Sequence, residues 1–240
     1  MYGGGGNSGA QFHNDFIEIF NRGRIEVNLT GWSVQYSSAT SGTWTVTPLT
    51  NVVLTPGEYY LIQEASGGSV GQNLPTPDAS GTINLATSAG KVALLNNSTP
   101  LSGTCPANSA IVDLVGYGLT ASCFEGTTRA PASANTSAIL RTENGCVDTQ
   151  NNGADFATGT PNPRNSRAPA NSCSAALCLL CTLDSAVEDY GQRANEQTKE
   201  RRSTKSNEMS FFRFSWITSV EESKNEYPNP NCETGVLDDS

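Results

Sequence analysis

The feature that most constrains the fold of this chain is a series of short runs in which apolar and polar residues alternate. In IEVNL (25–29) and WSVQY (32–36), every second side chain falls on the same face, as in a half-buried β-strand. Clusters of Gly, Pro, Asn and Ser separate such runs at short intervals. Because no stretch with helical periodicity alternates with them, a parallel α/β sheet is not expected. The pattern predicts an all-β fold of the sandwich type.

The expected strands lie in the first 173 residues. They cover residues 16–20, 25–29, 32–36, 43–46, 51–54, 58–64, 82–85, 91–96, 110–118 and 137–142. The run FIEIF (16–20) is apolar on both faces except at Glu18, which indicates a central strand. We expect the turn Asn21-Arg22-Gly23 to join it to the adjacent strand, with Gly23 at positive φ.

Trp32 opens one of these strands directly after a glycine. Its ring is large enough to fill the space between two sheets that lie about 10 Å apart, so we place it in the core. The other expected core residues are Ile17, Ile19, Val27, Leu29, Val34, Leu61, Val92, Leu94, Val112, Leu114 and Leu140.

The last part of the chain has a different texture. Residues 184–208 are charged and nearly free of apolar anchors, and the aromatic run FFRFSWI (211–217) has no obvious partner. The apolar stretch AALCLLC (175–181) is far shorter than the roughly 18 residues of a membrane span. We therefore expect one β-sandwich over residues 1–173, an acidic appendage of low structural content over residues 174–240, and no transmembrane segment.

The net charge of −9 bears on the class of partner. An acidic chain repels phosphate backbones, and no basic patch is visible before residue 190. Nucleic-acid binding is therefore not expected.

Four cysteines lie in loop-like segments rich in Ser, Asn, Gly and Pro. They are Cys105, Cys123, Cys146 and Cys173. Bridges that join them as two sequential pairs would each stabilise the fold by about 3 kcal/mol, but four cysteines allow three pairings, and the sequence leaves the choice open. Their wide spacing, with no histidine nearby, argues against a metal site. Glycosylation sequons occur at Asn28, Asn96, Asn97 and Asn135. Disulfides and sequons together predict an extracellular protein.

The cluster of His13, Asp15 and Glu18 could suggest general acid–base catalysis. Residues three apart on a strand project to opposite faces, so Asp15 and Glu18 should not converge. We expect Glu18 to pair with Arg22, Arg24 or another arginine. The sequence therefore predicts no catalytic residues and no cofactor.

Two glycine-containing loops have residues that could bind a ligand. In DTQNNGAD (148–155), the oxygens of Asp148, Asn151, Asn152 and Asp155 could hold calcium or could bond to the backbone in Asx-turns, and both readings remain open. The glycines at positions 4, 6 and 9 fit a dinucleotide fingerprint, but no strand precedes them and no helix follows, so a flexible loop is expected.

With this strand order, residues 2–173 resemble a lamin tail domain, the immunoglobulin-like sandwich of nuclear lamins and of many secreted bacterial proteins. The segments that carry the resemblance are NDFIEIFNRGRIEVNLTGWSVQY, VVLTPGEYYLIQE, LATSAGKVALLN, AIVDLVGYG, SAILRT and DFATGTPNPRNS. The most specific signature consists of Phe16, Ile17, Glu18, Ile19, Asn21, Gly31 and Trp32. The cysteine-bearing segments are similar to those of the secreted bacterial type.

The resemblance implies a module without catalytic apparatus that tethers or binds a protein or cell-surface ligand. Its alternative is an accessory-domain fragment of a secreted hydrolase, a nuclease or phosphatase, whose catalytic domain is absent from this chain. Relatives usually have a strand before YGGGG (2–6), so we expect the first strand to be lacking. We expect the binding surface in the loops 3–14, 66–80 and 122–134, with a patch around Tyr59, Tyr60 and Phe124 as another place for it.

Overall fold

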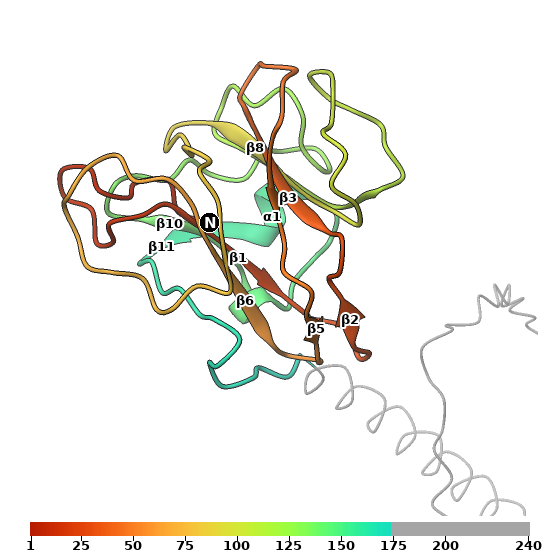
Figure 1. Cartoon of the computed structure of the whole chain (residues 1–240). Coiled ribbons are helices and arrows are strands. Elements are labelled where there is room, and N and C mark those ends of the chain that lie inside the picture. The colour runs from red at the N-terminus through yellow and green to blue at the C-terminus, as the bar shows by residue number, and fades with distance from the viewer. Residues whose placement is uncertain (174–240) are drawn as a thin grey trace, which may run out of the picture. The chain divides into compact units, whose positions relative to one another are not determined.

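The computed structural model of the chain describes residues 1–173 (Figure 1). These residues form the expected all-β, immunoglobulin-like sandwich. Its strands are β1 (Phe16–Phe20), β2 (Val27–Asn28), β3 (Ser33–Ser38), β4 (Thr45–Pro48), β5 (Val53–Leu54), β6 (Tyr59–Gln63), β7 (Ala79–Ser80), β8 (Gly90–Leu95), β9 (Ile111–Tyr117), β10 (Ala138–Arg141) and β11 (Phe156–Gly159). The 3₁₀-helix η1 (Glu143–Gly145) and the one-turn helix α1 (Asn152–Asp155) lie between β10 and β11 in the chain. The appendage expected over residues 174–240 lies outside the described residues.

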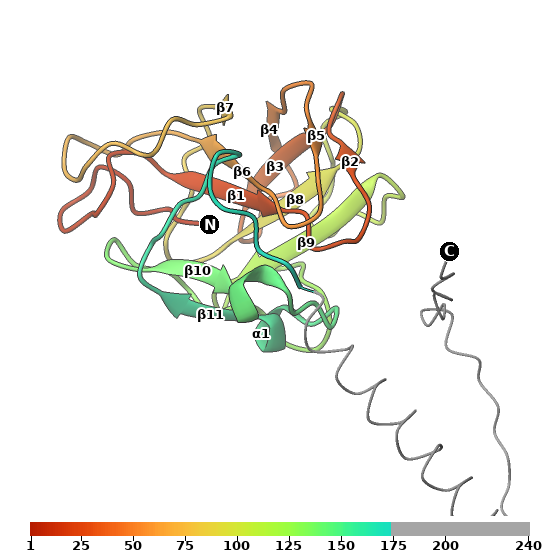
Figure 2. The ribbon, with the colours of Figure 1, turned by 90° about the horizontal axis from the view of Figure 1, so that it is seen from below.

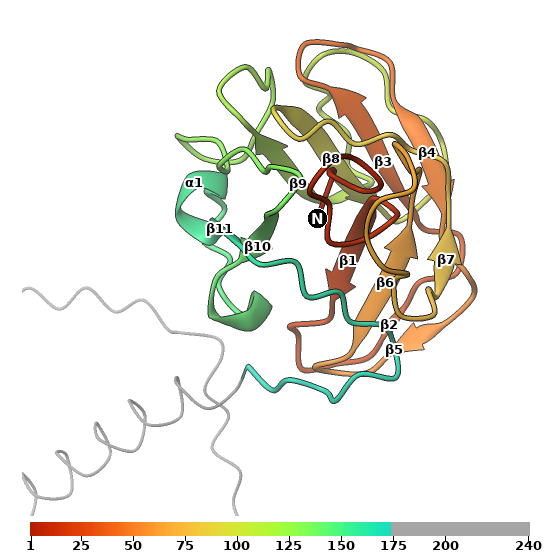
Figure 3. The same cartoon turned by 90° about the vertical axis from the view of Figure 1, so that its left-hand side faces the viewer.

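The strands of residues 1–173 form two principal sheets and two short ladders. One sheet has the order β4-β3-β8-β9 and is antiparallel throughout. The other has the order β1-β6-β7, in which β1 is antiparallel to β6 and β7 is parallel to it. β2 pairs with β5, and β10 pairs with β11. Figures 2 and 3 show the N-terminus between β1 and β10.

The main core fills the space between these layers, because alternate residues of each strand point inward. It includes Ile17, Val34, Ile62, Val92 and Ile139, from β1, β3, β6, β8 and β10. A second cluster gathers around Trp44, and a third gathers around Phe16. β1 therefore has apolar neighbours on both faces, as the run FIEIF predicts.

The prediction for Trp32 is only partly right. Its side chain is half-buried and packs against the main core from the edge, whereas Trp44 is 5 % exposed at the centre of the second cluster. Val112, also expected in the core, is 49 % exposed. The register of β8 and β9 shifts between Leu94 and Leu95, which leaves Val112 as the extra residue of a bulge.

The turn Asn21-Arg22-Gly23 does not join two paired strands. β1 pairs with β6, and β2 pairs with β5, so the chain passes from one ladder to another here. Gly23 is not among the residues with positive φ. Instead, the buried amide of Asn21 donates to the carbonyl oxygens of Ile25 and Leu54, each at 2.9 Å, and this fixes the connection.

The glycine run Gly3–Gly6 is buried and tightly packed, so the expectation of a flexible loop is wrong. A Cβ atom on Gly5 would lie 2.1 Å from the backbone carbon of Asn14, and one on Gly4 would lie 2.5 Å from the Cα of Asn135. The run is rich in glycine because four other backbone segments, at Leu85, Asn135, Asn14 and Gly68, approach it too closely for any side chain.

Residues 82–85, expected to form a strand, are held by buried carboxylates instead of a ladder. Ile83 N–H donates to Glu64 at 2.9 Å, and Leu85 N–H donates to Asp15 at 2.8 Å. Alternating side chains still point inward, which explains the strand-like pattern: Ile83 and Leu85 are each 1 % exposed.

Two disulfides close loops in the described part of the chain. They are Cys105–Cys123 and Cys146–Cys173, the sequential pairing among the three that the sequence allows. In the same part, no helix is long and apolar enough to cross a membrane.

Candidate binding cleft

A cleft of about 440 Å³ opens between β1, β9 and the β10–β11 ladder. This volume lies within the range of about 300–1,000 Å³ that is typical of ligand sites. Its apolar lining includes Ile17, Ile19, Trp32, Val92, Val112 and Ile139. The core of the sandwich is therefore accessible from this side, and the half-buried Trp32 borders the opening.

Arg141 is the central charged residue of the cleft. Its guanidinium lies 2.7 Å from Asp113, 3.3 Å from Asp148 and 3.6 Å from Asp155, and stacks on the ring of Phe156 at 4.4 Å. Three carboxylates and an aromatic face leave this cation fully compensated, which disfavours the binding of an anion here.

A second ion pair borders the cleft at β1. The carboxylate of Glu18 accepts hydrogen bonds from the main-chain N–H of Arg164 at 2.6 Å and from its guanidinium at 2.7 Å. The same guanidinium donates to the Tyr59 hydroxyl at 2.8 Å and lies over its ring. The expected pairing of Glu18 with an arginine is thus confirmed, although the partner comes from the segment after β11.

The acidic loop 148–155 borders the cleft through Asp148. Asp155 is fully buried and accepts hydrogen bonds from Thr149 N–H at 2.9 Å and from Asn151 N–H at 3.2 Å. Burial acts against it, yet these bonds and Arg141 hold the pKa of Asp155 below its usual range. Asp148 pairs with Arg22 at 2.9 Å.

Asn152 is also fully buried. Its side chain forms the hydrogen bonds to β9 that the main chain of a neighbouring strand would otherwise form. Its side-chain oxygen accepts from Gly116 N–H at 2.8 Å, and its amide donates to Leu114 O at 3.0 Å. Of the two readings left open for the loop, bonding to backbone is the one observed at Asn152 and Asp155. No group of three or more His, Cys, Asp or Glu side chains in residues 1–173 is arranged to hold a metal ion.

Two further carboxyls near the cleft have perturbed acidity. Burial raises the pKa of Glu125 to about 7, and the neighbouring Asp113 charge acts in the same direction. Burial also raises the pKa of Asp113, against the opposing effect of Arg141, and its Oδ1 is buried without a hydrogen-bond partner in the described residues.

Residues 1–119 match the family model of the Lamin Tail Domain. These residues are therefore similar to a lamin tail domain. No curated protein matches the chain. The match covers β1 to β9, whereas the β10–β11 ladder and the segment with Arg164 follow it in sequence. The cleft is therefore lined both by residues of the matched segment and by residues that follow it.

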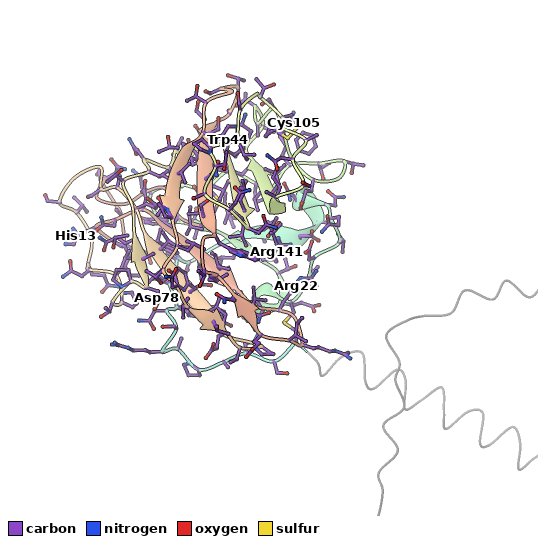
Figure 4. The ribbon with its side chains drawn as sticks, turned by 45° about the vertical axis from the view of Figure 1, so that its right-hand side comes forward. His13, Arg22, Trp44, Asp78, Cys105 and Arg141 are labelled. Atoms are coloured by element: carbon purple, nitrogen blue, oxygen red, sulfur yellow. A yellow bond between two sulfur atoms is a disulfide. The ribbon has the colours of Figure 1, made fainter. Side chains whose placement is uncertain are left out.

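The fold does not bring His13, Asp15 and Glu18 together. Asp15 is buried and accepts from Gly5 N–H and Leu85 N–H, each at 2.8 Å, whereas Glu18 faces Arg164. Burial raises the pKa of Asp15 to about 6. Figure 4 shows His13 far from Arg22 and Arg141, which lie on the same side of the domain.

The loops and the aromatic patch in which binding was expected do not form the cleft. Loops 3–14 and 66–80 lie against one another through the bridges Gly6–Val70 and Phe12–Gln72. Tyr59 and Tyr60 are 2 % and 0 % exposed, so the aromatic patch expected around them is not on the surface. No loop of the expected set lines the cleft.

Sequence reasoning missed the charged residues that border the cleft. Arg141 and Arg164 come from segments distant in sequence from the carboxylates and rings that they contact. One indication in the sequence that they matter is their position in segments that resemble lamin tail domains. Arg141 lies in SAILRT and Arg164 lies in DFATGTPNPRNS. Nothing local to either residue indicates its partner.

Proposed function

We propose that this protein is a non-catalytic, extracellular binding module of the lamin-tail type, and that the cleft between β1, β9 and β10 is its binding site. The observation that carries the proposal is the cleft itself: about 440 Å³ with an apolar lining in an otherwise well-packed sandwich. The two disulfides support an oxidising compartment.

The charges around the cleft favour an apolar ligand, such as a segment of a protein or of a cell-surface molecule. Arg22, Arg141 and Arg164, the three arginines that line it, are each paired with a carboxylate. A nucleic acid needs uncompensated cations to replace its counterions, and this lining does not supply them.

The binding proposal is tested by selecting displayed random peptides on the immobilised full chain. Val112 lines the cleft and is 49 % exposed, so Val112→Arg blocks the entrance with little effect on the fold. Val53, 43 % exposed on β5, does not line it, so Val53→Arg is the matched control. We expect selected peptides to lose binding to Val112→Arg but not to Val53→Arg. Peptides that bind both variants equally would contradict a site in the cleft.

The proposal that the protein has no catalytic activity is tested with the same purified full chain. We expect no hydrolysis of duplex DNA or p-nitrophenyl phosphate when the full chain is supplied with Mg²⁺ or Ca²⁺. Hydrolysis that follows the chain through gel filtration and disappears in Val112→Arg would show that the cleft is an active site.

A further inference from the structure

The four glycosylation sequons of the chain lie in its described part, and the cleft uses none of their asparagines. The sequons begin at Asn28, Asn96, Asn97 and Asn135. A glycan is bulky and hydrophilic, so the folded chain accommodates it only where the asparagine amide reaches solvent. The structure separates the four asparagines by this criterion.

The first sequon is presented to solvent. Asn28 is exposed on β2, whereas Leu29 beside it is 1 % exposed and anchors the strand. The side-chain oxygen of Asn28 accepts from Thr30 N–H at 2.9 Å, and its Nδ2 has no hydrogen-bond partner among residues 1–173. A Cβ atom added at Gly31, the next residue, would meet no atom within 4 Å. The nitrogen that would carry a glycan is therefore free and has open space around it.

Asn135 is instead engaged in the packing of two loops. Its side-chain amide donates to the main-chain oxygen of Ser8 at 3.0 Å. A Cβ atom on Gly4 would lie 2.5 Å from the Cα of Asn135, so the glycine run lies directly against this residue. A sugar on the Asn135 nitrogen would crowd the main chain at Ser8, and overpacking of this kind destabilises a fold.

The other two sequons overlap at the end of β8. Asn97 is half-buried, and its main-chain oxygen accepts from the Ser33 hydroxyl at 2.7 Å. Asn96 is exposed, but its side chain makes no hydrogen bond within residues 1–173 that would hold the amide in one orientation. Asn28 is the one of the four that is exposed and whose side-chain oxygen is bonded within its own sequon.

From these contacts we propose that Asn28 carries an N-linked glycan. The inference rests on the extracellular location in the proposed function and adds a modification site to it. The co-reactant is a lipid-linked oligosaccharide. Nδ2 of Asn28 forms a bond to C1 of the first sugar and gives up a proton, while the bond from C1 to the lipid diphosphate breaks and the diphosphate leaves.

The glycan lies on the face of β2 that points away from the cleft. Val27 and Leu29, the neighbours of Asn28, line the cleft, and side chains alternate between the two faces of a strand. Across the ladder Asn28 pairs with Val53, an apolar residue that is 43 % exposed. The first sugars therefore cover Val53 and leave the cleft accessible.

The test is the occupancy of each sequon in the full chain, expressed with a cleavable secretion signal in mammalian cells. Chains from the medium and from the cell membranes are treated with peptide N-glycosidase in heavy-oxygen water, which marks each glycosylated asparagine as labelled aspartate for mass spectrometry. We expect occupancy at Asn28 to be at least about tenfold higher than at Asn135, because crowding at Ser8 disfavours the second site.

Two substitutions at the exposed Thr30 are matched controls. Thr30→Val removes the hydroxyl that the sequon requires and should abolish labelling of Asn28, whereas Thr30→Ser should retain it. Unlabelled Asn28 in both fractions of the parent chain, occupancy no higher than at Asn135, or labelling that persists in Thr30→Val would overturn the proposal.

Peptide binding separates this inference from the proposed function. Peptides selected on the cleft should bind the chain equally before and after the glycosidase, and binding only after it would contradict the placement of the glycan away from the cleft. The two proposals fail separately, because unlabelled Asn28 leaves the peptide result standing and absent peptide binding leaves the labelling result standing.

Discussion

Single residues in this protein hold distant segments together through main-chain groups. Asp15 accepts the N–H groups of Gly5 and Leu85, and Glu64 accepts that of Ile83, although all are buried. A buried N–H without an acceptor is costly, so each carboxylate organises the segment that it bonds. The same principle explains the four consecutive glycines, whose backbone must lie against that of other segments without intervening side chains.

At this scale we predict that Gly5→Ala destabilises the full chain by at least about 2 kcal/mol, because its Cβ would overlap the backbone at Asn14 and Asp15. Gly23→Ala is the matched control, since its Cβ meets only the Asn21 side chain, at 3.2 Å. Urea denaturation of both variants measures the difference. Equal midpoints for the two would show that the glycine run is not tightly packed.

The elements of the sandwich have edges that are protected to different degrees. The exposed edge of β9 is capped by Asn152 and by Glu125, whose carboxylate accepts from Leu114 N–H at 3.3 Å. The facing edges of β1 and β10 have no such cap at Glu18, Phe20 and Arg141. The main-chain N–H groups at this uncapped edge should therefore exchange with solvent faster than those inside a ladder.

Two carboxyl groups, that of Glu125 at the capped edge and that of Asp15, make the stability of the fold depend on pH. Glu125 and Asp15 have folded-state pKa values of about 7 and about 6, above their unfolded values. The folded state therefore binds more protons, and the free energy of unfolding falls as pH rises from about 5 to 8. For the buried Asp15 the change is on the order of 2 kcal/mol.

Denaturation of the full chain at pH 5 and pH 8 measures this dependence. We expect greater stability at pH 5 and a smaller difference between the two pH values in Glu125→Gln. The exposed Glu26→Gln is the control and should retain the full difference. Higher stability at pH 8, or an unchanged difference in Glu125→Gln, would contradict the assignment of these carboxyls.

At the scale of the whole molecule, the sequence predicts the sandwich but not the cleft. Apolar residues at alternate or successive positions identify β1, β3, β6, β8, β9 and β10, because each of these strands buries one or both of its faces. It misses β7 and β11, which are too short or too polar to show the period, and it places a strand at 82–85, where carboxylates replace the ladder.

The candidate site could not be predicted for a related reason. The cleft arises where β1 and β10, separated by more than a hundred residues, face each other across Met1, and local patterns do not encode that distance. The expected loops drew attention because loops often bind ligands. Residues that line the cleft, such as Ile19 and Val112, were predicted instead as core, since the lining of an apolar cleft and a core have the same apolar pattern.

The most direct test of the open edge is amide hydrogen exchange of the full chain, resolved by residue with NMR. Ile17 and Ile19 bond to β6, whereas the N–H groups of Glu18 and Phe20 face the cleft. We predict an alternating pattern, in which Glu18 and Phe20 exchange on the order of a hundredfold faster than Ile17 and Ile19. Equal, slow exchange of all four amides would contradict the account, because it would mean that the edge of β1 is already covered.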